Sequence, residues 1–198
     1  MGRILLVRHG QTIANVKKIW HGQIDTELTD EGLQQAQKLG GHATQYIANP
    51  DRIFASPLQR ARITAEHFAA PHNLPVEQHP ELMEYHIGDW EGKDYREIIA
   101  ELDFFNTIIK DPDFAPPGGE SQRQAATRFY TKVEELAKQH REENIVIVAH
   151  GMVISFALAH WFAEQATDWG QYHCDNTAVC EISLDPHELI SFNQTLHL

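Results

Sequence analysis

Short apolar runs along the chain predict three buried β-strands, at residues 4–7, 52–55 and 144–149. Apolar runs of this length, bounded by polar residues, are typical of strands and are too short for most helices. The last quarter of the chain offers two shorter strands, at residues 177–183 and 189–192, which we expect at an edge of the sheet.

Segments with helical periodicity separate these strands. One stripe of apolar side chains follows Thr29, a suitable N-cap, and a second follows Ser121. Residues 152–162 predict an apolar helix, and Ser56 followed by Pro57 predicts the N-cap and first position of another. The stripes are Leu33, Ala36, Leu39, Ala43 and Tyr46 or Ile47 after Thr29, and Ala125, Phe129, Val133 and Leu136 after Ser121.

The alternation of strands and helices predicts an α/β fold. We expect a three-layer α/β/α sandwich with a mostly parallel sheet, because crossover helices cover both faces of such a sheet. The length of 198 residues suits one domain that covers residues 1–198.

Guanidinium and imidazole side chains follow three of the predicted strands. Arg8 and His9 follow the first strand, Arg60 lies in the first turn of the helix after the second, and His150 closes the third. Ligands of open α/β sheets bind outside the carboxyl ends of the strands, so these four side chains are expected together. The pocket that they form would be electropositive and would suit a dianionic phosphate monoester.

This combination favours phosphoryl transfer. His9 can act as a nucleophile toward phosphorus, and Gly10 lacks a Cβ that would keep a tetrahedral group away from the backbone. An Arg-His pair alone also occurs on the surface of ordinary domains, which is the simpler alternative for Arg8 and His9. The same chemistry at three strand ends makes the functional interpretation the better one.

Composition narrows the choice of partners. The net charge is −12, from 16 basic and 28 acidic residues, and no Lys/Arg-rich run occurs, so nucleic acid is not an expected partner. No stretch of 18 apolar residues and no secretory leader pattern is found, so we expect a cytoplasmic protein that does not bind membranes. The sequence does not predict the oligomeric state.

Cysteine and histidine usage gives no sign of a metal site. Cys174 and Cys180 are expected to be reduced, partly buried thiols rather than a disulfide or a catalytic pair. Thirteen histidines are present, but none has the spacing of known zinc motifs. We expect His140, His160 and His197 at the surface or at its boundary.

Five segments follow one another in a recognisable order. They are Arg8-His9-Gly10-Gln11-Thr12 with Asn15, Ser56-x-Leu58-x-Arg60-Ala61, Leu82-x-Glu84-x-x-x-Gly88, Pro117-Gly118-Gly119-Glu120-Ser121 and Val148-Ala149-His150-Gly151. This series resembles the motifs of the histidine phosphatase superfamily, which includes cofactor-dependent phosphoglycerate mutase, and it extends over most of the chain. The resemblance implies the phosphoglycerate mutase-like fold.

The resemblance also implies roles for the matching residues. His9 would be the nucleophile that becomes phosphohistidine, and Glu84 would be the proton donor. Arg8, Arg60 and His150 would grip the phosphate and count as both catalytic and substrate-binding residues.

Further substrate contacts are implied near this group. Asn15 would contribute its side-chain amide, and Gln23 and Gly151 would also contact substrate. His21 follows the Asn15 loop and is ranked below Gly22 and Gln23 as a pocket residue. No cofactor and no metal ion is implied, and the expected partner is a small phosphate monoester.

The segment after the glutamate separates branches of the family. Mutases carry Arg and Tyr where this chain has Tyr85 and Ile87, and Asp89-Trp90-Glu91-Gly92 resembles the phosphatase branch. We therefore expect a metal-independent phosphomonoesterase of the histidine acid phosphatase type, acting on small phosphorylated metabolites. A cofactor-dependent phosphoglycerate mutase remains an alternative. A catalytically silent phospho-ligand sensor is a further alternative, but it would not need Glu84.

Residues 93–117 are the least regular part of the pattern. Their apolar side chains predict a helix packed on the core, and a lid that closes over the substrate is the functional alternative. These side chains are Ile98, Ile99, Leu102, Phe104, Phe105, Ile108 and Ile109.

Overall fold

The computed structural model describes residues 2–102 and 104–198. The strands are β1 (Ile4–Arg8), β2 (Arg52–Ala55), β3 (Val76–Gln78), β4 (Ile145–Ala149), β5 (Val179–Leu184) and β6 (His187–Gln194). The α-helices are α1 (Ile13–Lys17), α2 (Asp30–Gly41), α3 (Ala43–Tyr46), α4 (Gln59–Ala69), α5 (Tyr95–Leu102), α6 (Phe104–Lys110), α7 (Gln122–Gln139) and α8 (Gly151–Phe162). Short 3₁₀ helices are η1 (Ala70–His72), η2 (Pro80–Leu82), η3 (Gly88–Trp90) and η4 (Asp168–Tyr172).

The described strands form one mixed sheet in the order β3-β2-β4-β1-β5-β6. The pairings β3-β2, β2-β4 and β4-β1 are parallel, whereas β5 runs antiparallel to β1 and β6 antiparallel to β5. The prediction of an α/β fold with a mostly parallel sheet is confirmed. The edge assignment was right only for the last strand, because β5 lies inside the sheet between β1 and β6.

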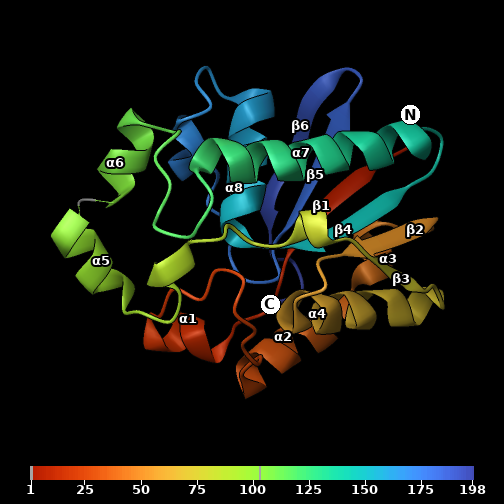
Figure 1. Ribbon diagram of the computed structural model, residues 1–198. Coiled ribbons are helices and arrows are strands. Elements are labelled where there is room, and N and C mark those ends of the chain that lie inside the picture. The colour runs from red at the N-terminus through yellow and green to blue at the C-terminus, as the bar shows by residue number, and fades with distance from the viewer. Residues whose placement is uncertain (1, 103) are drawn as a thin grey trace.

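Helices cover both faces of the sheet, with α7 and α8 on one side and α2 and α4 on the other (Figure 1). Side chains of a strand alternate between the two faces, so Leu6 packs toward the α7 and α8 side while Leu5 and Val7 pack toward α2 and α4. The central strands are buried on both faces, and their sequences are therefore continuous apolar runs.

The helix starts agree with the sequence in two cases and differ in a third. Thr29 accepts from the N–H of Gly32 and Ser121 from that of Gln124, as N-caps do. The predicted N-cap at Ser56 is wrong, because α4 begins at Gln59. The Ser56 hydroxyl instead accepts from the N–H of Leu58, 3.3 Å away, in the turn before the helix.

Residues 93–117 form α5 and α6 followed by an irregular stretch. Ile98 and Ile108 are buried in the core, as expected of packed helices, whereas Ile109 is exposed. Leu102, Phe104 and Phe105 lie outside the described side chains.

No helix in the described ranges is both long and apolar enough to cross a bilayer.

Candidate active site

His9 follows the carboxyl end of β1 and is buried. Its Nδ1 lies 2.7 Å from the carbonyl oxygen of Gly10, and because a carbonyl only accepts, Nδ1 carries the proton. The lone pair is then on Nε2. Burial, followed by the charges of Arg60 and Arg8, holds the pKa of His9 well below its ordinary value. His9 is therefore a neutral imidazole with a nucleophilic nitrogen.

His150 lies beside His9, with 5.2 Å between ring centroids, and has the opposite tautomer. The Nε of Arg60 donates to His150 Nδ1 over 3.2 Å, so the proton of the neutral ring is on Nε2. Burial and the charge of Arg60 keep the pKa of His150 well below its ordinary value. Within the part of the chain that the structure describes, this buried Nε2 has no hydrogen-bond partner.

Arg60 is buried behind the two histidines rather than along the cavity wall. Its guanidinium also donates to the carbonyl oxygens of Ile24, at 3.1 Å, and Gly22, at 2.7 Å. Burial lowers the pKa of Arg60 to about 10, which leaves the group charged at neutral pH. Arg60 thus fixes the tautomer of His150 and supplies positive charge to the site.

Arg8 lines the cavity and is held from behind. Its Nη1 donates to the carbonyl oxygen of Cys174 over 2.5 Å, while its buried Nε has no partner among the described residues. Gly151 permits this position, because a Cβ there would lie 3.2 Å from Nε of Arg8. Arg8 thus lines the cavity, and one of its buried donors is not used by the described part of the chain.

Gly10 lies where the chain after β1 passes close to α2. A Cβ at Gly10 would lie 2.6 Å from the carbonyl oxygen of Gly32 in α2. The missing side chain lets the end of β1 and α2 approach closely, and Gly10 itself lies outside the described cavity lining.

Asn15 presents its amide to the cavity from α1. Its Oδ1 accepts from the N–H of Thr12 at 3.0 Å, and Thr12 Oγ1 accepts from the N–H of Asn15 at 3.1 Å, which together form a capping box. Because the oxygen is engaged there, the NH₂ end of the amide is the part available as a donor.

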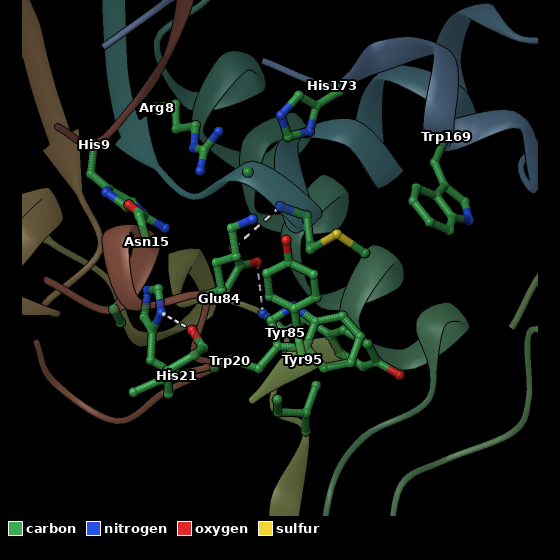
Figure 2. Close-up of a pocket in the computed structure, with 17 residues that line it drawn as sticks. Arg8, His9, Asn15, Trp20, His21, Glu84, Tyr85, Tyr95, Trp169 and His173 are labelled. Carbon is green, nitrogen blue, oxygen red and sulfur yellow. Dashed lines mark hydrogen bonds between the residues drawn. The ribbon is translucent and has the colours of Figure 1, made fainter. Parts of the chain in front are cut away.

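Glu84 lies opposite Arg8 (Figure 2). Its carboxylate contacts the first turn of α8. Its Oε1 accepts from the N–H groups of Tyr85 and Val153, and its Oε2 accepts from that of Met152 at 3.2 Å. The first turn of α8 thus binds this carboxylate. A carboxylate oxygen has two lone pairs, so Oε2 can still take a proton.

Gln23 supports the site from outside the cavity lining. Its side-chain amide donates to the carbonyl oxygen of Glu84 at 2.9 Å, and its backbone N–H donates to Glu91 at 2.9 Å. Gln23 thus positions Glu84 and the loop that binds Arg60.

The cavity residues that were missed or underrated from sequence include His21, Trp169 and His173. The rings of His21 and His9 have centroids 6.3 Å apart, and burial lowers the pKa of His21 to about 3. The position of His21 next to Gly22 was the available signal. Trp169 and His173 come from η4 and the loop after it, and no motif marks them.

Arg128 holds the loop that carries Glu84. It pairs with the carboxylate of Glu120 at 2.5 Å and donates to the carbonyl oxygens of Glu81, Met83 and Glu84. The Pro117–Ser121 motif therefore helps to position Glu84, because its Glu120 pairs with Arg128.

We expect Arg128→Met to lower the free energy of unfolding by about 2–4 kcal/mol, because it leaves a largely buried carboxylate and three carbonyls without their donor. Arg123→Met is the matched control, since Arg123 lies on the same helix and pairs with the exposed Asp113. Urea denaturation compares the two. Equal, small losses of unfolding free energy in both variants would mean that the hydrogen bonds of Arg128 add little to stability.

The two cysteines and His197 all lie in the interior of the protein. Cys174 and Cys180 are buried free thiols with sulfur atoms 3.6 Å apart. His197 is buried rather than at the boundary, because Tyr46 and Thr177 bind its two ring nitrogens. Among the described residues, no group of three or more His, Cys, Asp or Glu side chains could hold a metal ion.

A cavity of about 400 Å³ is lined by Arg8, His9, Asn15 and Glu84, and His150 lies next to His9 outside this lining. At one end of the cavity His9 lies in the wall together with Arg8 and Asn15, next to the ring of His150. Glu84 faces this end across the cavity. Such an arrangement can bind a phosphoryl group, accept it on His9 and pass a proton to or from an oxygen atom.

Comparison with known proteins agrees with this geometry. The family model for branch 1 of the histidine phosphatase superfamily matches residues 4–193. An adenosylcobalamin/alpha-ribazole phosphatase of Escherichia coli is 31% identical over 87% of this chain and 85% of its own length. Phosphoserine phosphatase 1 of Hydrogenobacter thermophilus is 26% identical over 100% of this chain and 95% of its own length.

Solved structures match over most or all of the chain. The phosphoserine phosphatase of Entamoeba histolytica in complex with 3-phosphoglyceric acid has a TM-score of 0.88 and 30% identity, with full coverage of both chains. A mycobacterial glucosyl-3-phosphoglycerate phosphatase in complex with VO₃ has a TM-score of 0.82 and 31% identity, covering 92% of this chain and 93% of that one. The chain belongs to the histidine phosphatase superfamily, branch 1.

Proposed function

We propose that the chain is a phosphomonoesterase that hydrolyses small phosphorylated metabolites through a phosphohistidine on His9. One observation carries the proposal: His9 lines the cavity with Arg8 and lies beside His150, and the buried Nε of Arg8 and Nε2 of His150 have no partners among the described residues. A buried donor without a partner is costly, and a phosphate oxygen is the acceptor that would satisfy both.

The reaction then needs two displacements at phosphorus. Nε2 of His9 attacks, the bond from phosphorus to the alcohol oxygen breaks, and Glu84 gives that oxygen a proton. Water next attacks the phosphohistidine, its proton goes to Glu84, and the bond from phosphorus to nitrogen breaks to release phosphate. The guanidinium groups of Arg8 and Arg60 stabilise the charge on the equatorial oxygens during both steps.

Transfer to water, rather than back to a bound sugar acid, fits the residues beside the cavity. Tyr85 and Ile87 stand where mutases carry Arg and Tyr, and both line the cavity. Neither supplies the cation that would retain a phosphoglycerate. A sensor without activity would have no use for a carboxylate held at the cavity as Glu84 is.

The low pKa of His9 supports an activity of the acid phosphatase type. A pKa well below the ordinary value of 6.5 keeps the imidazole unprotonated as the pH falls through that value. The nucleophile therefore stays competent in mildly acidic solution.

We expect the activity to be independent of metal ions, because the guanidinium groups of Arg8 and Arg60 supply the positive charge that a bound cation supplies elsewhere. Hydrolysis of p-nitrophenyl phosphate should continue unchanged in EDTA and should be inhibited by vanadate, which can mimic five-coordinate phosphorus. Loss of activity in EDTA that a divalent ion restores would contradict metal independence. The absence of any turnover would contradict the proposed function itself.

A further inference from the structure

The cavity continues beyond the phosphate-binding end, and its remaining wall is largely apolar. Aromatic and aliphatic side chains contribute most of it, several of them on segments far apart in the sequence (Figure 2). This apolar wall consists of Trp20, Tyr85, Ile87, Tyr95, Met152 and Trp169.

A short backbone ladder holds two of these aromatic residues in place. The N–H of Trp20 donates to the carbonyl of Lys93 at 3.0 Å, and the carbonyl of Trp20 accepts from the N–H of Gly92 at 2.7 Å. The N–H of Tyr95 donates to the carbonyl of Lys18 at 3.1 Å. Trp20 and Tyr95 are thus part of a fixed wall and not of two independent loops.

The charged groups of the cavity are concentrated at its phosphate end. Glu84 is bound by three backbone N–H groups, and Arg8 is held by the carbonyl of Cys174. Among the described lining residues, Lys18 is the remaining Lys or Arg side chain, and it is exposed. Burial lowers the pKa of both His21 and His173, which favours their neutral forms.

A substrate with a second anionic group would fit this wall poorly. A carboxylate that leaves water needs charge-assisted hydrogen bonds, of which a guanidinium gives the strongest. Arg60 and Arg128 cannot supply them here, because Arg60 is committed to His150, Gly22 and Ile24, and Arg128 lies behind the Glu84 loop. An apolar group, by contrast, would replace water against aromatic surface.

Given the phosphatase activity proposed above, we propose that this enzyme prefers phosphate monoesters of uncharged alcohols with an apolar or aromatic body, which binds against the apolar wall. Phosphoserine and 3-phosphoglyceric acid, which are bound in two structures of the Entamoeba histolytica phosphoserine phosphatase, are then poor substrates of this chain.

A series of primary alkyl phosphates tests this preference, because their leaving groups differ little in chemistry. We expect kcat/KM for 2-phenylethyl phosphate and n-hexyl phosphate to exceed that for glycerol 1-phosphate, phosphoserine and 3-phosphoglycerate by on the order of 10- to 100-fold. Released phosphate is the readout for every ester.

Variants of the wall show where the preference arises. Tyr95→Ser and, separately, Trp20→Leu should lower kcat/KM for 2-phenylethyl phosphate by about 10-fold, with little change for glycerol 1-phosphate. Tyr130→Ser is the matched control, since Tyr130 stacks on His160 outside the cavity lining. Thermal denaturation of each variant identifies any loss that comes from unfolding.

Three outcomes would overturn the inference. Equal or better hydrolysis of phosphoserine or 3-phosphoglycerate would show that the substrate class is wrong while the phosphatase activity stands. Loss of such hydrolysis in Lys18→Ala would place a carboxylate at Lys18 instead. Release of no phosphate from any ester would remove the proposed function, and this inference with it.

Discussion

Replacement of His9 by alanine is expected to lower kcat by three or more orders of magnitude. The imidazole is the one group that the proposed mechanism bonds to phosphorus, and neither Arg8 nor His150 can replace it as a nucleophile. The hydrogen bonds of its side chain run to the neighbouring Gly10, so the fold should survive the change. Steady-state hydrolysis of p-nitrophenyl phosphate measures the loss.

A labelling experiment separates covalent catalysis from mere binding. The wild type, mixed briefly with ³²P-labelled substrate and quenched in alkali, should carry an acid-labile label on His9. His9→Ala should carry none, whereas His187→Ala, which removes an exposed imidazole from β6, should label and turn over like the wild type. An active His9→Ala enzyme would refute the mechanism.

The sheet and its main helices could be predicted because burial leaves a direct mark on sequence. The segments that became β1, β2 and β4 are continuous apolar runs, since both of their faces are covered. The starts of α2 and α7 were marked by Thr29 and Ser121, whose hydroxyls accept the first N–H groups. In these segments the local sequence was enough to predict the element.

Other elements depend on contacts that the sequence does not display. The strand β3 has three residues, too few for a periodic pattern, and it exists through its pairing with β2. The helix α4 starts later than predicted, because the Ser56 hydroxyl closes a turn before the helix. Pro57 signals a helix start equally well in either case.

In the candidate site, too, some residues could be placed from the sequence and others could not. Arg8, His9 and His150 could be placed together because they end neighbouring parallel strands, β1 and β4. The position of Gln23 behind Glu84, and of Trp169 across the cavity, depends on how loops fold back over the sheet. The fixed tautomers of the two central histidines likewise depend on partners that only the folded chain supplies.

Replacement of Glu84 by glutamine is expected to slow hydrolysis of alkyl phosphates by roughly 10²- to 10⁴-fold, the usual share of general acid catalysis. An alkoxide cannot leave readily without a proton, and a carboxamide cannot give one. The amide oxygen can still accept from the N–H groups of Tyr85 and Val153, so the side chain should keep its place. Measurements of kcat with 2-phenylethyl phosphate give the loss.

The leaving group provides the decisive comparison for Glu84. Nitrophenolate departs without protonation, so Glu84→Gln should reduce hydrolysis of p-nitrophenyl phosphate much less, provided that dephosphorylation does not limit its rate. Glu81→Gln is the matched control, because Glu81 lies on the same loop outside the cavity lining and should leave both rates unchanged. Near-wild-type rates of Glu84→Gln on both esters would show that Glu84 is not the acid. Glu91 would then be the next carboxylate to test, although its two oxygens accept from the N–H groups of Gln23 and Ile24 and so favour a structural role.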